Sequence, residues 1–165
     1  VMGLPGDRQS RLRFPRAGKL SAELAEARVS HYLHGADREK WIRNVRHFGQ
    51  VRLASTAPAI DVVFHGRNGE LEYDFELGAG ADPNQARIVV EGADAVTLAG
   101  DGSLQIRVGD FVMRQRRPVA SKDGQTVPVR FALSAKTNVV SFLVGPYDMR
   151  RPLVIDPVIE SSRLT

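Results

Sequence analysis

The stretch Ile60–Leu77, which reads IDVVFHGRNGELEYDFEL, decides the fold of this chain. Its central Asn68-Gly69 is a strong signal for a two-residue hairpin turn, because both central residues of a type I′ turn need a positive φ. With the turn there, each strand gathers its apolar side chains on one face, whereas a one-residue shift would mix the two faces. The apolar face then pairs Ile60 with Leu77, Val62 with Phe75 and Phe64 with Tyr73, and the opposite face pairs Asp61 with Glu76, Val63 with Asp74 and His65 with Glu72.

Further turn signals follow at intervals of roughly ten residues, which is typical of sandwiches and barrels of antiparallel strands. The turns at 100–102 and 109–110 predict a meander that pairs Leu98 with Leu104, Val108 with Phe111 and Ile106 with Met113. The turn at 123–124 leads into further strands. The sequence therefore predicts an all-β fold, an antiparallel β-sandwich of two packed sheets with little helix.

The chain divides into three predicted parts. Residues 1–26 form a lead-in with one short strand or helical turn, the helix-like stretch being LSAELAEA at 20–27. Residues 27–158 form the all-β domain, and 159–165 begin a linker to a following module. We also expect the chain to be a fragment, because it begins with valine and carries an apolar run close to its end.

The apolar run Leu153–Ile155 is predicted to be a strand bracketed by Pro152 and Pro157. Proline donates no hydrogen bond to a sheet, so this strand should be short or lie at a sheet edge. Val158 and Ile159 would then remain just beyond the strand, as an apolar patch for a neighbouring domain or subunit to cover.

Composition limits the class of protein. Of 165 residues, 42% are hydrophobic and 25% charged, which indicates a globular chain and not a disordered one. No apolar run approaches the ~20 residues of a membrane helix, so no membrane span is predicted. The absence of cysteine excludes disulfide scaffolds, thiolate zinc sites and cysteine nucleophiles.

Charge is segregated along the chain. The net charge of +4 divides into basic blocks at 1–54 and 114–165 and an acidic block at 55–113. We expect the blocks to face and neutralise one another; the alternative is a basic patch for an acidic glycan or another polyanion. Candidate binding residues for that alternative are Arg114, Arg116, Arg117, Arg150 and Arg151. We expect no nucleic-acid partner, because these short clusters lack interleaved aromatic residues.

Two constellations could carry chemistry. The strand 70–77 aligns Glu70, Glu72, Asp74 and Glu76 on one face, and carboxylates at this ~5–9 Å spacing serve glycoside hydrolases. The alternative is a solvated face that arginines such as Arg114 and Arg116 neutralise. His31, His34 and Asp37 have metal-like spacing, but residues three apart on a strand point to opposite faces. We therefore predict no metal site, no cofactor and no catalytic residue.

An ordered set of short blocks resembles a bacterial domain of unknown function that precedes SBBP (seven-bladed β-propeller-type) repeats in large secreted or cell-surface proteins. The blocks lie at 30–35, 40–41, 44–45, 59–64, 71–75, 80–83, 91–94, 114–118, 145–148 and 151–157. Two positions depart from that pattern: Ala57-Pro58-Ala59 replaces Tyr-Pro-Gly, and Phe64-His65 replaces two tyrosines. The segment Glu160–Thr165 matches the start of a repeat only faintly.

The resemblance implies an extracellular or cell-surface location and a following domain, or repeats, in the same polypeptide as partner. It supplies no catalytic or binding residue. We expect a non-catalytic structural or adhesive module, with a protein or glycan surface as a further partner. The alternative is an Arg-rich module that binds an acidic glycan or another polyanion, and the third hypothesis is a hydrolase that uses the acidic face of 70–77.

Overall fold

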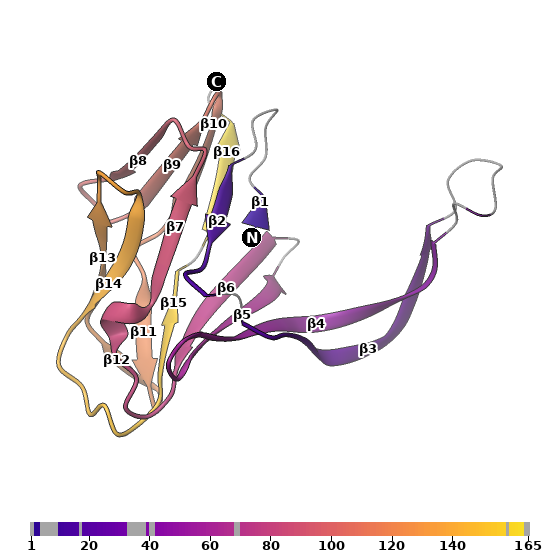
Figure 1. Cartoon of the computed structure of the whole chain (residues 1–165), viewed down its shortest axis with the longest axis horizontal. Coiled ribbons are helices and arrows are strands. Elements are labelled where there is room, and N and C mark those ends of the chain that lie inside the picture. Colours follow the sequence, from indigo (N-terminus) through magenta and orange to yellow (C-terminus); the bar gives the residue numbers. More distant parts are fainter. Residues whose placement is uncertain are drawn as a thin grey trace.

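Three antiparallel sheets build two packed layers (Figure 1). The computed structural model describes residues 2–3, 10–16, 18–32, 39, 42–67, 70–157 and 159–163. Over these residues the regular secondary structure is almost entirely β-strand, as the turn signals predict, and the all-β sandwich is confirmed.

Each sheet draws on distant parts of the chain. The five-stranded sheet has the order β1 (Met2–Gly3), β2 (Arg11–Arg13), β7 (Arg87–Glu91), β14 (Val139–Val144) and β13 (Val129–Ser134). The four-stranded sheet has the order β16 (Ile159–Arg163), β10 (Phe111–Gln115), β9 (Leu104–Val108) and β8 (Ala95–Leu98). The seven-stranded sheet has the order β12 (Gln125–Val127), β11 (Val119–Lys122), β15 (Leu153–Asp156), β6 (Glu70–Leu77), β5 (Ile60–Arg67), β4 (Ile42–Ala57) and β3 (Leu20–Tyr32).

The seven- and four-stranded sheets share one layer. Two consecutive strand pairs connect them, because β10 leads into β11, β15 leads into β16, and both pairs are antiparallel. The five-stranded sheet forms the other layer. A single-turn 3-10 helix, η2 (Pro83–Gln85), leads into β7.

Aromatic rings join the two layers. Phe75 on β6 is fully buried, and its ring centroid lies 5.2 Å from that of Phe142 on β14. Phe14, just after β2, contacts Phe64, Tyr73 and Phe75 edge-on at centroid distances of 5.7–6.2 Å. Edge-to-face pairs of this kind add to the free energy of simple burial. The apolar face predicted from the first hairpin is therefore the centre of the core.

The predicted hairpin registers are confirmed. In the first hairpin Val62 pairs with Phe75 and Asp61 with Glu76, although Asn68-Gly69 itself lies outside the described residues. The meander pairs Leu98 with Leu104 and Val108 with Phe111, as expected. At the fourth turn Asp123 and Gly124 have φ values of 50° and 77°, and glycine adopts such a positive φ without the penalty that a Cβ brings.

The N-terminal part contains a short strand, β2, as one predicted alternative has it, but the helical alternative and the separate lead-in need correction. The helix-like stretch 20–27 lies in β3, because pairing with β4 overrides its local helix propensity. The lead-in 1–26 is also not separate from the domain: β2 pairs with β7, and Leu12 and Phe14 are buried in the core. A domain boundary at residue 27 therefore cuts through β3.

The C-terminal predictions need two corrections, both beyond Pro157. Leu153–Ile155 lies in a short strand, as expected, and of the two alternatives, a short strand or an edge strand, it is the first, because β15 is central, between β11 and β6. Beyond Pro157 the chain pairs again, as β16 along β10, so residues 159–163 are not a linker. Ile159 is only 7% exposed and belongs to the core; it is not the predicted surface patch.

The hairpin of β3 and β4 extends the seven-stranded sheet beyond the sandwich. Figure 1 shows it as a long arm leaving the body next to β5 and β6. β3 has 13 residues and β4 has 16, against eight each for β5 and β6. Only the base of the arm is therefore opposite the second layer.

Candidate functional site

The described acidic side chains of β6, predicted as a candidate site, lie on the outer face of the seven-stranded sheet. Arg52 on β4 is its basic neighbour: the guanidinium bonds Glu23 at 2.8 Å, Asp61 at 3.1 Å and Glu76 at 2.6 Å. These three carboxylates hold the pKa of Arg52 above its usual range. The arrangement fixes the register of four neighbouring strands, from β3 to β6, more than it adds stability, because partly exposed ion pairs contribute only ~0–1 kcal/mol.

Arginines such as Arg114 and Arg116 are the basic partners that the sequence predicts for this face, whereas the ion pairs described above come from Arg52. Arg114 lies on β10 in the four-stranded sheet and bonds Asp101 and Ser103. Arg52 was missed because the sequence does not show that β4, 16 residues long, pairs with β5 in this register. The internal neutralisation itself is confirmed: Arg13–Glu91, Arg52–Glu76 and Arg114–Asp101 each join a basic block to the acidic one.

Part of the acidic face is buried and not solvated as expected. Glu72 is only 4% exposed, and its carboxylate lies 3.7 Å from His65 Nδ1. His65 Nε2 lies 3.0 Å from Asp74 Oδ2, whereas Asp74 Oδ1 is buried with no hydrogen-bond partner. Burial, followed by the nearby charge of Asp156, raises the pKa of Asp74. A buried carboxylate with one unpaired oxygen destabilises the folded state when it is ionised.

We predict that Asp74→Asn stabilises the domain at pH 7 by about 1 kcal/mol, the usual size of a single-substitution effect. Because the folded-state pKa of Asp74 is raised, wild-type stability should increase as pH falls from 7 through that pKa, and the gain should be complete at the unfolded value near ~3.9. Asparagine removes this charge and should flatten that part of the curve. Urea unfolding at several pH values measures the effect.

Asp61→Asn is the matched control, since Asp61 is an acceptor for Arg52 on the same face. It should lower stability at pH 7 by ~0–1 kcal/mol. If Asp74→Asn is no more stable than the wild-type chain at pH 7, the ionised Asp74 carboxylate does not lower the free energy of unfolding and the prediction is wrong.

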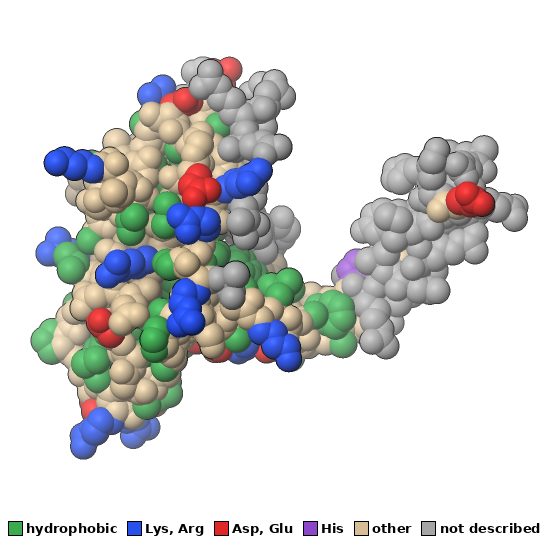
Figure 2. Space-filling model, viewed as in Figure 1, with side chains coloured by type: hydrophobic (Ala, Val, Ile, Leu, Met, Phe, Trp, Pro, Cys, Tyr) green, Lys and Arg blue, Asp and Glu red, His purple; other side chains and the backbone are tan. Residues whose placement is uncertain are grey.

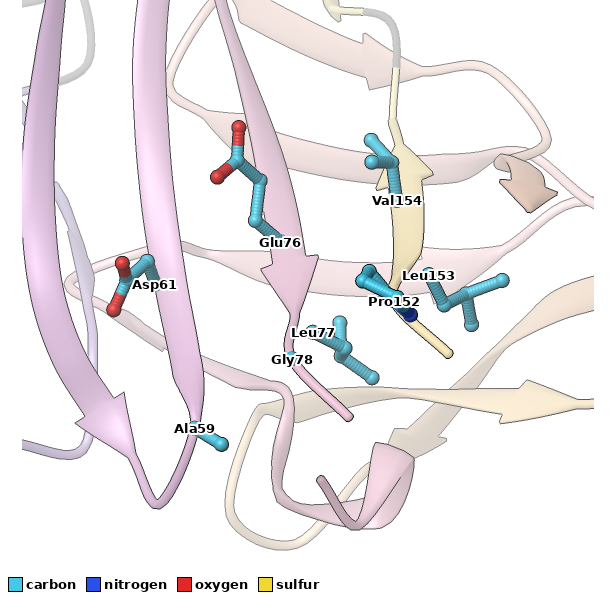
Figure 3. A pocket seen from close by; sticks show the side chains of 8 residues that line it. All are labelled: Ala59, Asp61, Glu76, Leu77, Gly78, Pro152, Leu153 and Val154. Atoms are coloured by element: carbon cyan, nitrogen blue, oxygen red, sulfur yellow. The ribbon is translucent and has the colours of Figure 1, made fainter. Parts of the chain in front are cut away.

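A pocket of about 390 Å³ opens where β6 ends and β5 and β15 begin. Figure 3 shows Asp61 and Glu76 projecting from neighbouring strands at its rim. It is lined by Ala59, Asp61, Glu76, Leu77, Gly78, Pro152, Leu153 and Val154. Both carboxylates already bind Arg52. Glycoside hydrolysis needs one protonated carboxyl group as the acid and one ionised carboxylate as the base or nucleophile. Here Asp61 and Glu76 both accept hydrogen bonds from the same guanidinium, so the arrangement does not assign them these different roles.

The predicted arginine candidates do not form one patch. Arg114 pairs with Asp101 across the four-stranded sheet, and hydrogen bonds from Ser103, with the Arg114 guanidinium, lower the pKa of Asp101 to about 2. Arg150 pairs with Asp148, and Arg151 with Asp123 beside the β11–β12 turn. Arg116 and Arg117 are exposed between β10 and β11. Arg116 and Arg117 precede β11 (Val119–Lys122), whereas Asp123, the partner of Arg151, follows it, so the length of β11 separates the two groups.

A different basic surface lies on the outer face of the five-stranded sheet. Arg11 and Arg13 flank the buried Leu12 on β2. Arg87 is exposed on the neighbouring strand β7, and Arg130 is exposed on β13, which β14 separates from β7. Figure 2 shows Lys and Arg side chains spread over the face of the sandwich in view. Sequence reasoning missed this surface because its residues come from three distant strands. The alternation of buried and exposed positions could have shown that these arginines face outward in each strand, but not that the strands belong to one sheet.

The structure does not show His31, His34 and Asp37, the residues with metal-like spacing, together in a metal site. His31 is in β3, while His34 and Asp37 lie outside the described residues. Over the part of the chain that the structure describes, no group of three or more His, Asp or Glu side chains is arranged to hold a metal ion. No helix in that part is long and apolar enough to cross a membrane.

The base of the arm exposes large apolar side chains. Leu20 is 65% exposed, Leu24 66% and Phe48 38%. Leu20 and Ala22 pair with Leu53 and Val51, and these β4 residues pair in turn with the core strand β5. The core-facing side of the sheet therefore continues outward as an uncovered apolar row. Figure 2 shows hydrophobic side chains where the arm leaves the sandwich.

Comparisons with known proteins identify a family and nothing more specific. No significant match was found among curated proteins or among solved structures. A family match covers residues 11–158, from β2 to just beyond β15, and so includes both layers of the sandwich and the arm. The chain belongs to the family described as domain of unknown function DUF7948.

Proposed function

We propose that this chain is a non-catalytic structural or adhesive module, and that the β3–β4 arm is its contact surface. The observation that carries the proposal is the uncovered apolar row of Leu20, Ala22 and Leu24 on an arm that leaves the sandwich. Contiguous apolar surface of this kind marks sites of protein contact in soluble proteins.

The shape of the arm supports this function. An isolated two-stranded hairpin is marginally stable in water, because it has no second layer against which to bury its side chains. Here β4 is anchored through its second half, where Gln50–Leu53 pairs with β5. A partner that covers the apolar row would supply the missing layer for the rest of the arm.

The proposal also concerns the larger protein to which this module belongs. We place the module in a larger secreted or cell-surface bacterial protein, next to a following domain or SBBP repeats. The support is the ordered set of sequence blocks between residues 30 and 157 that resembles the domain preceding such repeats. In this setting the arm would contact a neighbouring module or a surface on another molecule.

A second candidate function is binding of an acidic glycan or another polyanion. The observation that favours it is the basic outer face of the five-stranded sheet, formed by Arg11, Arg13, Arg87 and Arg130. Binding there would weaken steeply with salt, because each neutralised anion releases counterions. The hydrolase remains third, since the carboxylates at the rim of the pocket are bound to Arg52.

Hydrogen–deuterium exchange tests the proposed function. We expect the β3 amides of residues 20–26 to exchange at least tenfold more slowly in the complete parent polypeptide than in this chain alone at low concentration. The control is β8, another open edge, whose amides should exchange equally in both. Equal exchange of β3 in both proteins would contradict the proposal.

A heparin column separates the second candidate from the first. Retention that salt abolishes, and that Arg87→Glu with Arg130→Glu removes, would assign function to the basic face. The control is Leu20→Glu with Leu24→Glu, which introduces two glutamates on the arm without removing an arginine and should leave such retention unchanged.

A further inference from the structure

We propose that the arm is covered by a second copy of this chain, through antiparallel pairing of the two β3 edges about a two-fold axis at Ala22. The two seven-stranded sheets would then form one continuous sheet across the dimer. This inference rests on the proposed function, since it names the partner of the same apolar row.

The backbone of β3 is an open edge. It pairs with β4 on one side only, over residues 20–32. Among the described strands the other sheet-edge strands are shorter, with six residues in β13, five in β16, four in β8, three in β12 and two in β1. Proteins protect long edges with proline, lysine or bulges. No proline or lysine occurs between Leu20 and Tyr32, and the register shifts of β3 lie beyond Ala25, so residues 20–25 form a regular open edge.

The side chains on this edge are small or apolar on the core-facing side. Leu20, Ala22 and Leu24 alternate along β3 and project to that side. Gly49 on β4 makes room for Leu24, because a Cβ there would lie 3.3 Å from the Leu24 Cβ. An incoming strand therefore meets an apolar row with no charged residue in it.

A second copy fits this row because the row is self-complementary. With the axis at Ala22, Leu20 lies opposite Leu24 of the second copy, Ala22 lies opposite its counterpart, and Leu24 lies opposite Leu20. Residues directly opposite on antiparallel strands have Cβ atoms ~4.5–5.5 Å apart, so each leucine pair would be in contact. An isologous interface of this kind closes at two copies.

The polar side of β3 is compatible with the same register. Ser21 would lie opposite Glu23 of the second copy, with Lys19 diagonal to that glutamate. Opposite charges at such positions favour the pairing. Each Glu23 is also bonded to Arg52 of its own chain at 2.8 Å, so the two glutamates bring no uncompensated charge to the axis.

The backbone at Leu24 is a separate observation. Its φ is 54°, in the left-handed region that a leucine rarely adopts, and its side chain is 66% exposed. Strain of this kind persists where another interaction offsets it, and it concentrates at functional positions. In a single copy most of the leucine side chain faces solvent, whereas in the dimer it would pack on Leu20 of the second copy.

Disulfide trapping tests the register directly, because the chain contains no cysteine. We expect Ala22→Cys to form a covalent dimer under mild oxidation at least tenfold faster than Thr97→Cys. Thr97 is the matched control, since it is exposed on β8, the open edge of another sheet. Cysteines directly opposite on antiparallel strands lie within the Cα–Cα range that a disulfide needs.

Sedimentation of the unmodified chain tests the oligomeric state. We expect a dimer that Leu20→Glu with Leu24→Glu converts to a monomer with an unchanged thermal melt, because both leucines are exposed in one copy. Leu143→Glu should leave the dimer intact, since Leu143 is 41% exposed on the five-stranded sheet, away from the arm.

A monomeric wild-type chain at ~100 µM, with Ala22→Cys cross-linking no faster than Thr97→Cys, would overturn the second-copy inference. If β3 is nevertheless protected in the parent polypeptide, another module covers the arm and the proposed function stands. If β3 is unprotected there as well, both proposals are wrong.

Discussion

Replacing Phe75 with alanine is expected to lower the free energy of unfolding by about 3–5 kcal/mol. Phe75 is fully buried and contacts three rings, with centroids 6.0 Å away for Phe14, 6.0 Å for Tyr73 and 5.2 Å for Phe142. Phe142 belongs to the opposite layer, so the substitution leaves a cavity between two sheets that cannot both move inward. Urea unfolding with linear extrapolation measures the change.

The arm supplies a control for this prediction. Phe48→Ala removes the same atoms from a side chain that is 38% exposed on β4. It should cost less than ~1 kcal/mol, because little apolar surface is returned to water. Similar costs for the two variants would contradict the position of Phe75 at the centre of the two-layer core.

Local signals explain what could be predicted from the sequence. The first hairpin follows from Asn68-Gly69 and from the alternation that places Val62 and Phe75 on one face, and both act within 18 consecutive residues. The meander and the turn at Asp123-Gly124 have the same local character. The residues of a turn fix the register of a hairpin, and the position of the turn determines which side chains of both strands point to the core.

Long-range pairing explains most of what could not be predicted. β2 joins β7 across more than 70 residues, and β16 joins β10 across more than 40, with no turn to mark either pairing. The stretch 20–27 has alanine, leucine and glutamate, which favour helix locally. Its strand conformation is decided by pairing with β4, which no local pattern in β3 reveals.

The candidate site shows the same division. The acidic face of β6 was predicted from alternation, and Glu72, Asp74 and Glu76 do share one side of the sheet, while the Glu70 side chain lies outside the described part. Which cation neutralises them depends on strand order, and β4 brings Arg52 to Glu76 from 24 residues away. Burial of Glu72 likewise depends on packing around the sheet, because alternation alone marks its side as polar.

Deleting residues 152–157 is expected to abolish cooperative folding. β15 is the only connection between β11 and β6 in the described sheet, so its loss separates β11 and β12 from the other four strands. Leu153 and Ile155 are fully buried, and each large-to-alanine change at such sites costs ~2–5 kcal/mol. Their combined loss alone approaches the ~5–15 kcal/mol that stabilises a typical domain.

The substitutions Leu153→Ala with Ile155→Ala test the same point in a chain of unchanged length. This variant should lose ~4–10 kcal/mol and its cooperative thermal transition, as seen by calorimetry and near-ultraviolet circular dichroism. Val154→Ala is the control on the same strand: Val154 is partly exposed and faces away from the core, so its cost should stay near ~1 kcal/mol. The strand works as a bridge because Ile155 pairs with Ala120 on one side and with Phe75 on the other. A deletion variant that melts cooperatively near the wild-type temperature would mean that the two parts of the sheet hold together without it.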